Sequence, residues 1–257
     1  MRFYELFDKL EFDHDKLIDD LFNNVSKLGA QVIQGKEYET PLYHGFGGWS
    51  ITSRSGEWSD GWDFFQNVDG DELEVFFKPE NIFKAKKFFG ISHSLEHKNP
   101  TQAYVGEIAK VVDQLVAMGM YPRRVRVTCL RAHCKSLVHR DANDNEYSAR
   151  LHIPLVTNPK CVFICEGESL HMEVGKVYLV STNLWHQIRN DSDHDRYHII
   201  CDFYDVGHNT QNFKYEGDFS QLEDLSLEIR KRIDEAVIEP ELYEEFEAVR
   251  QKFITNP

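Results

Sequence analysis

The spacing of hydrophobic positions along this chain changes near residue 120. Before that point they recur every three or four residues, which predicts helices over 13–28, 79–90 and 102–118. After it, apolar and polar residues alternate, as is typical of strands with one buried face. The expected strands are 124–129, 150–156, 161–166, 172–180 and 196–204. Several short strands at this spacing predict a β-sandwich or a barrel.

Local signals mark the ends of the chain and the stretch before the strands. Residues 3–12 could form an early strand, whereas 35–78, rich in Gly, Ser, Asp and aromatic residues, are typical of loops and short strands. Trp49 and Trp62 could line a substrate entrance, but core or rim packing is the favoured interpretation. Near the C-terminus, the capping box at 220–223 predicts one helix.

A second C-terminal helix is expected from Pro240 onward. Together the two helices predict a helical extension over 216–257, appended to a main domain over 1–215. They either cover an open end of the β core or supply a surface for a homodimer, and the sequence does not decide between these roles. The predicted fold class is therefore mainly β with flanking helices.

Composition narrows the class of partner. The chain has 257 residues, of which 41% are hydrophobic, and this is enough for one sizeable core. Its formal net charge of −14 argues against nucleic acid and anionic membranes as partners, because both require basic surface. Five cysteines without a regular framework predict reduced thiols in a cytoplasmic protein. We expect neither a signal peptide nor a transmembrane helix.

The strand region carries candidate metal ligands. If residues 139–141 are extended, His139 and Asp141 point to the same side of the strand, so one metal can take both side chains. His186 follows far enough along the chain for several strands to return beside the first. Two histidines and one carboxylate fill one face of an octahedron and leave the other open, as in non-haem Fe(II) oxygenases.

A candidate anion site follows the second histidine. Arg196 lies ten positions after His186, a spacing that suits a short turn and the next strand. Its planar guanidinium can bind a carboxylate through two parallel hydrogen bonds. This indicates 2-oxoglutarate as co-substrate, because its keto-acid end chelates iron and its far carboxylate needs a cation. His198 shares a strand face with Arg196 and is a further candidate for the border of the pocket.

Residues 148–155 and 175–180, followed by Trp185-His186 and Arg196, resemble the aspartyl/asparaginyl β-hydroxylase family. The region is also similar to bacterial cis-proline hydroxylases, and the resemblance covers roughly 120–205. It implies a double-stranded β-helix (jelly-roll, cupin-like) core that works with Fe(II), 2-oxoglutarate and O2. The metal ligands would be His139, Asp141 and His186.

The resemblance also implies roles for four residues in binding 2-oxoglutarate, namely Arg196, Arg150, His152 and Thr128. We expect Arg196 and Arg150 to hold the distal carboxylate together, with His152 and Thr128 as lesser contacts. By alternation alone, Arg150 and His152 would be the solvent-facing side of an ordinary half-exposed strand. The resemblance instead places them in a polar pocket.

The predicted function is that of a dioxygenase. It would hydroxylate an unactivated C–H bond of an amino acid, an amino-acid derivative or a peptidyl side chain, with release of succinate and CO2. One alternative is a cupin-type metalloenzyme that does not use 2-oxoglutarate and would not need Arg196. Another is a non-catalytic jelly roll that binds a metal or ligand. The letters His139-Arg140-Asp141 also occur in protein kinases, but Glu146 stands where a kinase needs Asn.

Overall fold

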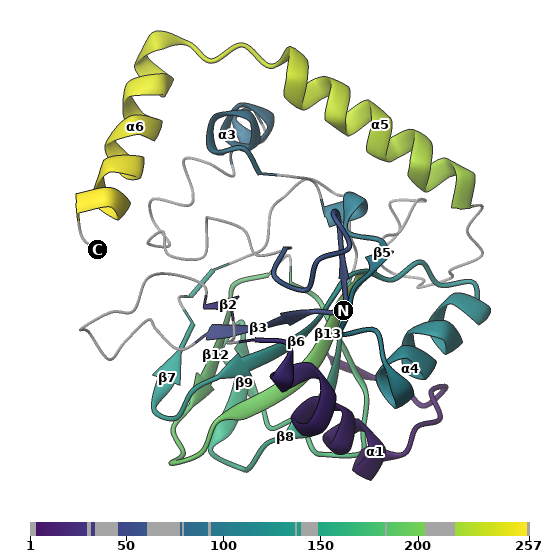
Figure 1. Cartoon of the computed structure of the whole chain (residues 1–257). Coiled ribbons are helices and arrows are strands. Elements are labelled where there is room, and N and C mark those ends of the chain that lie inside the picture. Colours follow the sequence, from purple (N-terminus) through teal and green to yellow (C-terminus); the bar gives the residue numbers. More distant parts are fainter. Residues whose placement is uncertain are drawn as a thin grey trace.

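The computed structural model describes residues 4–29, 32–33, 46–60, 78, 80–91, 94–136, 138–139, 149–182, 184–203 and 219–255. Within these ranges, two β-sheets pack face to face, two helices cover the outer face of the larger sheet, and three helices form a separate layer at one end (Figure 1). The predicted class, mainly β with flanking helices, is confirmed. The sheets form an open sandwich and do not close into a barrel.

The larger sheet has the strand order β1-β11-β8-β13-β6-β3-β2, with every neighbouring pair antiparallel. Its strands are β1 (Tyr4–Leu6), β2 (Val32–Ile33), β3 (Phe46–Ser50), β6 (Arg123–Leu130), β8 (Ala149–Val156), β11 (Tyr178–Val180) and β13 (Arg196–Phe203). The smaller sheet has the order β10-β9-β12-β7. Its strands are β7 (Cys134–Lys135), β9 (Cys161–Cys165), β10 (Glu168–Leu170) and β12 (His186–Asn190). A further pair joins β4 (Thr52–Ser53) to β5 (Asn99–Pro100).

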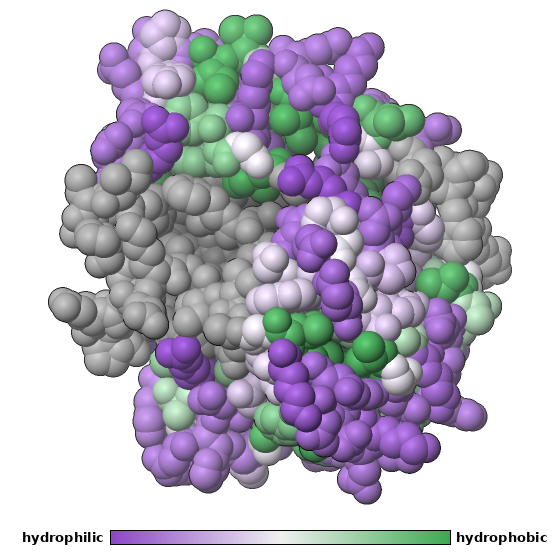
Figure 2. All heavy atoms as spheres, in the orientation of Figure 1, coloured by the Kyte–Doolittle hydropathy of each residue, from purple (hydrophilic) through white to green (hydrophobic). Residues whose placement is uncertain are grey.

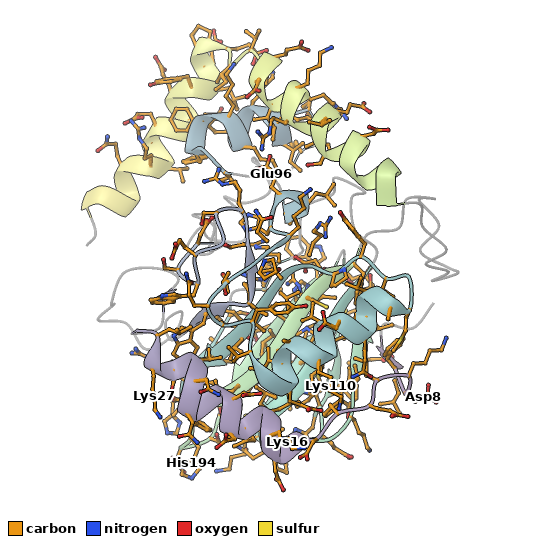
Figure 3. The ribbon with its side chains drawn as sticks, turned by 45° about the vertical axis from the view of Figure 1, so that its right-hand side comes forward. Asp8, Lys16, Lys27, Glu96, Lys110 and His194 are labelled. Carbon is orange, nitrogen blue, oxygen red and sulfur yellow. The ribbon has the colours of Figure 1, made fainter. Side chains whose placement is uncertain are left out.

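Two apolar clusters lie on opposite faces of the larger sheet. The outer cluster joins β6, β8 and β13 to α1 (His14–Asp19) and α4 (Gly106–Ala117), which lie against this face in Figure 3. After α1 the chain continues as a π-helical turn, Asp20–Asn24, and a 3-10 turn, Val25–Lys27. The inner cluster fills part of the space between the sheets and includes Leu130, Phe163 and Ile188. Each central strand therefore has one face toward the helices and one toward the other sheet.

One glycine allows the larger sheet to form where β3 meets β6. Gly48 has φ of +151°, and a Cβ on it would lie 1.9 Å from the Val127 carbonyl oxygen. Only a residue without a side chain fits this close approach. Trp49, the next residue, is buried in the outer cluster and donates from Nε1 to the Gly29 carbonyl at 3.1 Å. Its predicted core packing is confirmed, whereas Trp62 lies outside the described residues.

The helix predicted over 102–118 begins later, at Gly106. Gly106 has φ of +50°, which is a left-handed conformation that cannot continue a right-handed helix. The first turn is capped from another segment, because Asp20 accepts a hydrogen bond from the Glu107 backbone N–H at 2.6 Å. A cap that comes from a residue 87 positions away leaves no local signal in the sequence.

The predicted and the observed strands differ in three of the places that matter here. The expected strand 172–180 is only β11, since a turn with Gly175 at φ +80° occupies its first part. The strand β12, which carries His186, was not predicted at all. Polar and apolar residues alternate only weakly in β12, so the local pattern does not predict a strand. The segment is a strand because it pairs with β9 on one side and β7 on the other. The early strand is confirmed for Tyr4–Leu6 alone.

The helical layer consists of α3 (Ile82–Phe89), α5 (Phe219–Glu235) and α6 (Pro240–Thr255). Phe246 of α6 is fully buried between Phe88 and Phe89 of α3, and Ile229 of α5 packs against Leu95. Figure 2 shows hydrophobic side chains over this layer, some of them at its outer edge, among hydrophilic ones. Part of the predicted main domain thus packs with the predicted extension. The boundary at 216 and the homodimer stay predictions.

The five cysteines form no disulfide, and all except the half-buried Cys134 are buried, as is typical of cysteines that pack as small apolar residues. Among the described helices, none is long and apolar enough to cross a membrane.

Candidate active site

The face of the larger sheet that meets the smaller sheet is polar and buried. Strand alternation puts Leu151, Ile153 and Ile199 in the outer cluster with the helices. The opposite face presents side chains that are at most 3% exposed: Thr128, His152, Arg196, His198 and Asp202. The polar side of the strands therefore lies between the two sheets and not in water. Burying so many hydrogen-bonding groups carries a large desolvation penalty, which indicates a binding site more than a structural core.

His139 and His186 lie directly opposite each other at the edge of the smaller sheet. Their backbones exchange both hydrogen bonds, at 3.0 Å from His139 N to His186 O and 2.8 Å in return. The imidazole centroids are 4.4 Å apart. Directly opposed residues of an antiparallel pair project to the same side, so the fold brings together two of the three predicted metal ligands.

The His186 ring is fixed in a form suited to a metal. Its Nδ1 lies 2.8 Å from the Leu184 carbonyl oxygen, which can only accept, so Nδ1 carries the proton and Nε2 the lone pair. Such a hydrogen bond from the second ring nitrogen is the usual way in which proteins orient a metal-bound histidine. Phe163 stacks on the same ring, at 5.4 Å between centroids and 15° between planes. The pair therefore fits a divalent transition metal.

Asp141, the predicted carboxylate ligand, lies outside the described residues, as does Arg140. Among the residues that are described, no three His, Cys, Asp or Glu side chains gather closely enough to hold a metal. The geometry thus supports two ligands of the predicted set, and the third stays a prediction from the spacing of the sequence.

Arg196 is the first residue of β13 and is 3% exposed. Its Nη2 lies 2.6 Å from His198 Nδ1, and within the described part of the chain no carboxylate pairs with it and Nη1 has no hydrogen-bond partner. Burial lowers the pKa of the guanidinium to about 10, which leaves it charged at neutral pH. Burying a cation without an anion raises the free energy of the folded state by roughly several kcal/mol. Binding of an anion would remove this penalty.

Ring contacts connect Arg196 to the histidine pair. His198 Nδ1 lies 3.4 Å from His152 Nδ1, and the His152 ring meets Phe163 edge-on at 6.0 Å between centroids. Phe163 in turn stacks on His186. Thr128, on the neighbouring strand β6, donates from its hydroxyl to the His198 carbonyl at 3.2 Å. The proposed anion end and the proposed metal end therefore belong to one continuous cluster.

The structure separates Arg150 from Arg196. Arg150 stands opposite Asp202 in the β8–β13 register, six positions along β13 from Arg196, or about 20 Å of strand. Its Nε donates to Asp202 Oδ1 at 2.6 Å. Because His152 lies between the two arginines along the sheet, the expectation that both grip the same carboxylate does not fit this register. Arg150 lies beyond His152, on the side away from Arg196.

Asn190 fixes the turn that joins β12 to β13. Its side-chain amide donates to the carbonyls of Leu130, Arg131 and His194 at 2.8–3.0 Å. Its Oδ1 accepts from the Ser192 backbone N–H at 3.1 Å and from the Ser192 hydroxyl at 2.6 Å. A single side chain thus holds the end of β6, the turn and the start of β13 together. In Figure 3 the labelled His194 marks this turn at the end of the molecule away from the helical layer.

Two residues of the cluster were missed or given only a minor place by sequence reasoning. Asp202 received no role, and His198 was expected only at the border of a pocket, but both are 1% exposed. The signal that could have found them is the period of two: Arg196, His198 and Asp202 are polar at alternating positions of one strand. Alternation of polar and apolar residues alone, however, predicts that a polar face of this kind points to solvent.

Comparison with known proteins identifies a family for this chain. The family model of aspartyl/asparaginyl β-hydroxylase matches residues 75–205, just over half of the chain. No curated protein matches in sequence. Among solved structures, a 2OG-Fe(II) oxygenase family oxidoreductase from Burkholderia pseudomallei is 15% identical, with a TM-score of 0.34. The match covers 39% of this chain and 59% of that one, so it spans less than two thirds of the Burkholderia protein.

Two further solved structures are similar at low identity. A cupin domain from Bordetella pertussis is 18% identical over 34% of this chain and 95% of that one, with a TM-score of 0.26. A prolyl hydroxylase from Trichoplax adhaerens, in complex with a hypoxia inducible factor peptide fragment, is 10% identical over 82% of this chain and 87% of that one, with a TM-score of 0.45. The family model carries the assignment: the chain belongs to the aspartyl/asparaginyl β-hydroxylase family.

Proposed function

We propose that this protein is an Fe(II)- and 2-oxoglutarate-dependent dioxygenase that hydroxylates an unactivated C–H bond. Its substrate would be an amino acid, an amino-acid derivative or a peptidyl side chain, and its by-products succinate and CO2. The observation that carries the proposal is Arg196, a buried guanidinium with no acidic partner among the described residues, connected through a series of ring contacts to a facing pair of histidines. Family membership supports the same class of reaction.

In this proposal, His139 and His186 would hold iron through imidazole nitrogens, and Asp141 would be the third ligand. Iron held by these residues would supply the oxygen-activating chemistry of non-haem iron oxygenases. Leu184 has a supporting role, because its carbonyl holds the His186 ring in the tautomer that the metal needs. Phe163 shields that ring from water.

Arg196 would bind the far carboxylate of 2-oxoglutarate. The anion would replace the missing counter-charge, and two parallel N–H···O bonds would fix its direction. Thr128 and His152 would lie beside the anion on the same buried sheet face. Arg150 lies at the other end of the sheet face, where Asp202 holds its orientation.

The same observation weighs against the two alternatives. A cupin-type metalloenzyme that does not use 2-oxoglutarate needs the histidine pair but gains nothing from a buried, unpaired guanidinium. A non-catalytic jelly roll that binds a ligand could use Arg196, but would not need an imidazole pair fixed as two metal ligands.

An anaerobic titration with Mn(II) in place of iron tests the proposal. The wild-type protein should bind 2-oxoglutarate, and Arg196→Ala should weaken that binding by about 30-fold to several thousand-fold, because a desolvated carboxylate loses its cation at roughly 2–5 kcal/mol. Arg196→Lys should recover only part of it. Mn(II) affinity itself should be unchanged, since Arg196 is not a proposed ligand.

A second assay tests turnover. With Fe(II), ascorbate and O2, the wild-type protein should convert 2-oxoglutarate to succinate, with the rate raised by its substrate in a panel of free amino acids and short peptides. Absence of 2-oxoglutarate binding in the wild-type protein, with the metal bound, would sink the proposal in favour of the cupin-type alternative. Binding without any succinate would favour the non-catalytic one.

A further inference from the structure

His198 is the one described side chain that contacts the Arg196 guanidinium at hydrogen-bond distance, and it does so from the same strand. The distance from Arg196 Nη2 to His198 Nδ1 is 2.6 Å, and the two residues are 3% and 1% exposed. We infer that His198 is a positioning residue for the anion site: its neutral imidazole accepts from Arg196 and holds the guanidinium in the orientation that binds the co-substrate carboxylate. The inference rests on the proposed function.

The donor and acceptor roles in this contact follow from chemistry. A guanidinium has only N–H groups and can only donate, so His198 Nδ1 must be the acceptor and must carry no proton. The proton of the neutral ring is then on Nε2. His152 Nδ1 lies 3.4 Å from the same nitrogen. The hydrogen bond between the two residues of β13 therefore runs from Arg196 to His198.

The contact matters because Arg196 has no other fixed partner in the described part of the chain. An arginine side chain has several rotatable bonds, and ordering it in the absence of ligand removes a large part of its conformational entropy in advance. An acidic residue at position 198 would also hold the guanidinium, but would neutralise it and compete with the carboxylate. A neutral acceptor orients the cation and leaves its charge for the ligand.

The position of the imidazole is itself fixed. The His198 backbone carbonyl accepts from the Thr128 hydroxyl at 3.2 Å, and its ring meets the His152 ring edge-on at 5.7 Å and 81°. Burial and the adjacent Arg196 charge keep the pKa of His198 well below its usual range, so the ring stays neutral. Protonation would put a second N–H donor against the guanidinium and abolish the contact.

Three variants separate the positioning role from a general effect on folding. His198→Asn places a side-chain oxygen close to where Nδ1 stands and keeps an acceptor. His198→Leu keeps approximate volume and removes the acceptor. His194→Asn changes an exposed histidine in the preceding turn and is the control.

The readout is anaerobic binding to the Mn(II)-loaded protein of two ligands with the same keto-acid end. 2-Oxoglutarate carries the far carboxylate, whereas 2-oxopentanoate has a methyl group there. His198→Leu should weaken 2-oxoglutarate roughly 10- to 100-fold, as expected when a hydrogen bond to a charged group is lost, and leave 2-oxopentanoate unchanged. His198→Asn should recover most of the affinity, and His194→Asn should match wild type.

Equal weakening of both ligands in His198→Leu would show a general distortion and overturn the inference. So would wild-type affinity for 2-oxoglutarate in that variant, or no recovery in His198→Asn. If His198→Leu does not fold, the His198→Asn result decides, since loss of 2-oxoglutarate affinity with 2-oxopentanoate retained would contradict the acceptor role. Failure of the proposed function looks different, because the wild-type protein itself would then bind no 2-oxoglutarate.

Discussion

Arg150 and Asp202 form a buried ion pair across β8 and β13, with the arginine Nε 2.6 Å from the aspartate Oδ1 and the two side chains 13% and 2% exposed. The other carboxylate oxygen has no hydrogen-bond partner among the described residues. Arg150 therefore compensates the buried negative charge of Asp202. This arrangement differs from that of Arg196, whose charge has no acidic partner in the same part of the chain.

Arg150→Ala should destabilise the fold by about 3–5 kcal/mol, because it leaves a buried carboxylate uncompensated. The double variant Arg150→Met/Asp202→Leu should return most of this loss, since neither charge then remains. Urea unfolding measures both. The control is Arg189→Ala, which breaks an exposed pair with Asp191 and should change stability by no more than about 1 kcal/mol. If Arg150→Ala lowered the free energy of unfolding by no more than about 1 kcal/mol, the role of the buried pair would be contradicted.

The histidine pair predicts metal binding. His139→Ala or His186→Ala removes one of three proposed protein ligands, so Mn(II) affinity should fall by more than the roughly 10–100-fold typical of outer partners of a metal ligand. Titration followed by electron paramagnetic resonance measures this without turnover. His194→Ala, at an exposed position, should bind as wild type does. Retention of stoichiometric, tight metal in either ligand variant would show that the assignment is wrong.

His198 predicts a pH dependence of stability. Its folded-state pKa lies well below 6.5, through burial first and then the charge of Arg196, with smaller effects of His152 and His171. The unfolded chain therefore binds a proton that the folded chain does not. Stability is fully present above about pH 6.5 and falls as the pH drops toward the folded pKa, by at most about 1.4 kcal/mol per pH unit from this group.

Urea unfolding of wild type and His198→Asn between pH 7.5 and 5.0 isolates this contribution, because other titrating groups are common to both proteins. The difference in the free energy of unfolding should change with pH, and wild type should lose more stability on acidification. Parallel curves would mean that His198 titrates alike in both states.

Asn190 predicts a large structural effect. Asn190→Ala deletes the amide that satisfies three backbone carbonyls and the acceptor for Ser192, and the site is fully buried. Leaving such groups unpaired should cost about 3–5 kcal/mol. Asn190→Asp retains the acceptor but turns a carboxylate toward three carbonyl oxygens, so it should be no better. Thermal unfolding checks both variants. A loss of stability under about 1 kcal/mol in either would contradict this role of the Asn190 side chain.

The sequence predicted those features whose cause is local. Alternation along β6, β8 and β13 was sufficient for the central strands, whereas the expected proximity of His139 and His186 also needed the family resemblance. The strand β12 was missed because its neighbours on both sides, β9 and β7, supply the reason for its conformation.

The position of Arg150 depends on a long-range register. Nothing near Arg150 in the chain shows that it faces Asp202, 52 positions away, rather than Arg196. The first residue of α4 could not be predicted for the same reason, because Asp20 caps the helix from a distant turn. Buried polar faces such as that of His198 are also misread by alternation, since a polar residue inside a binding cavity and one in water give the same pattern.

The short segment between His186 and Arg196 crosses from one sheet to the other, and the hydrogen bonds of Asn190 fix its turn. The interval between these two residues is therefore set by the fold and not by the ligand. Under the proposed function, this fixed separation selects the co-substrate by its length. A keto diacid one carbon shorter or longer than 2-oxoglutarate presents the same two end groups, but it cannot meet both the metal end and the guanidinium at their fixed separation.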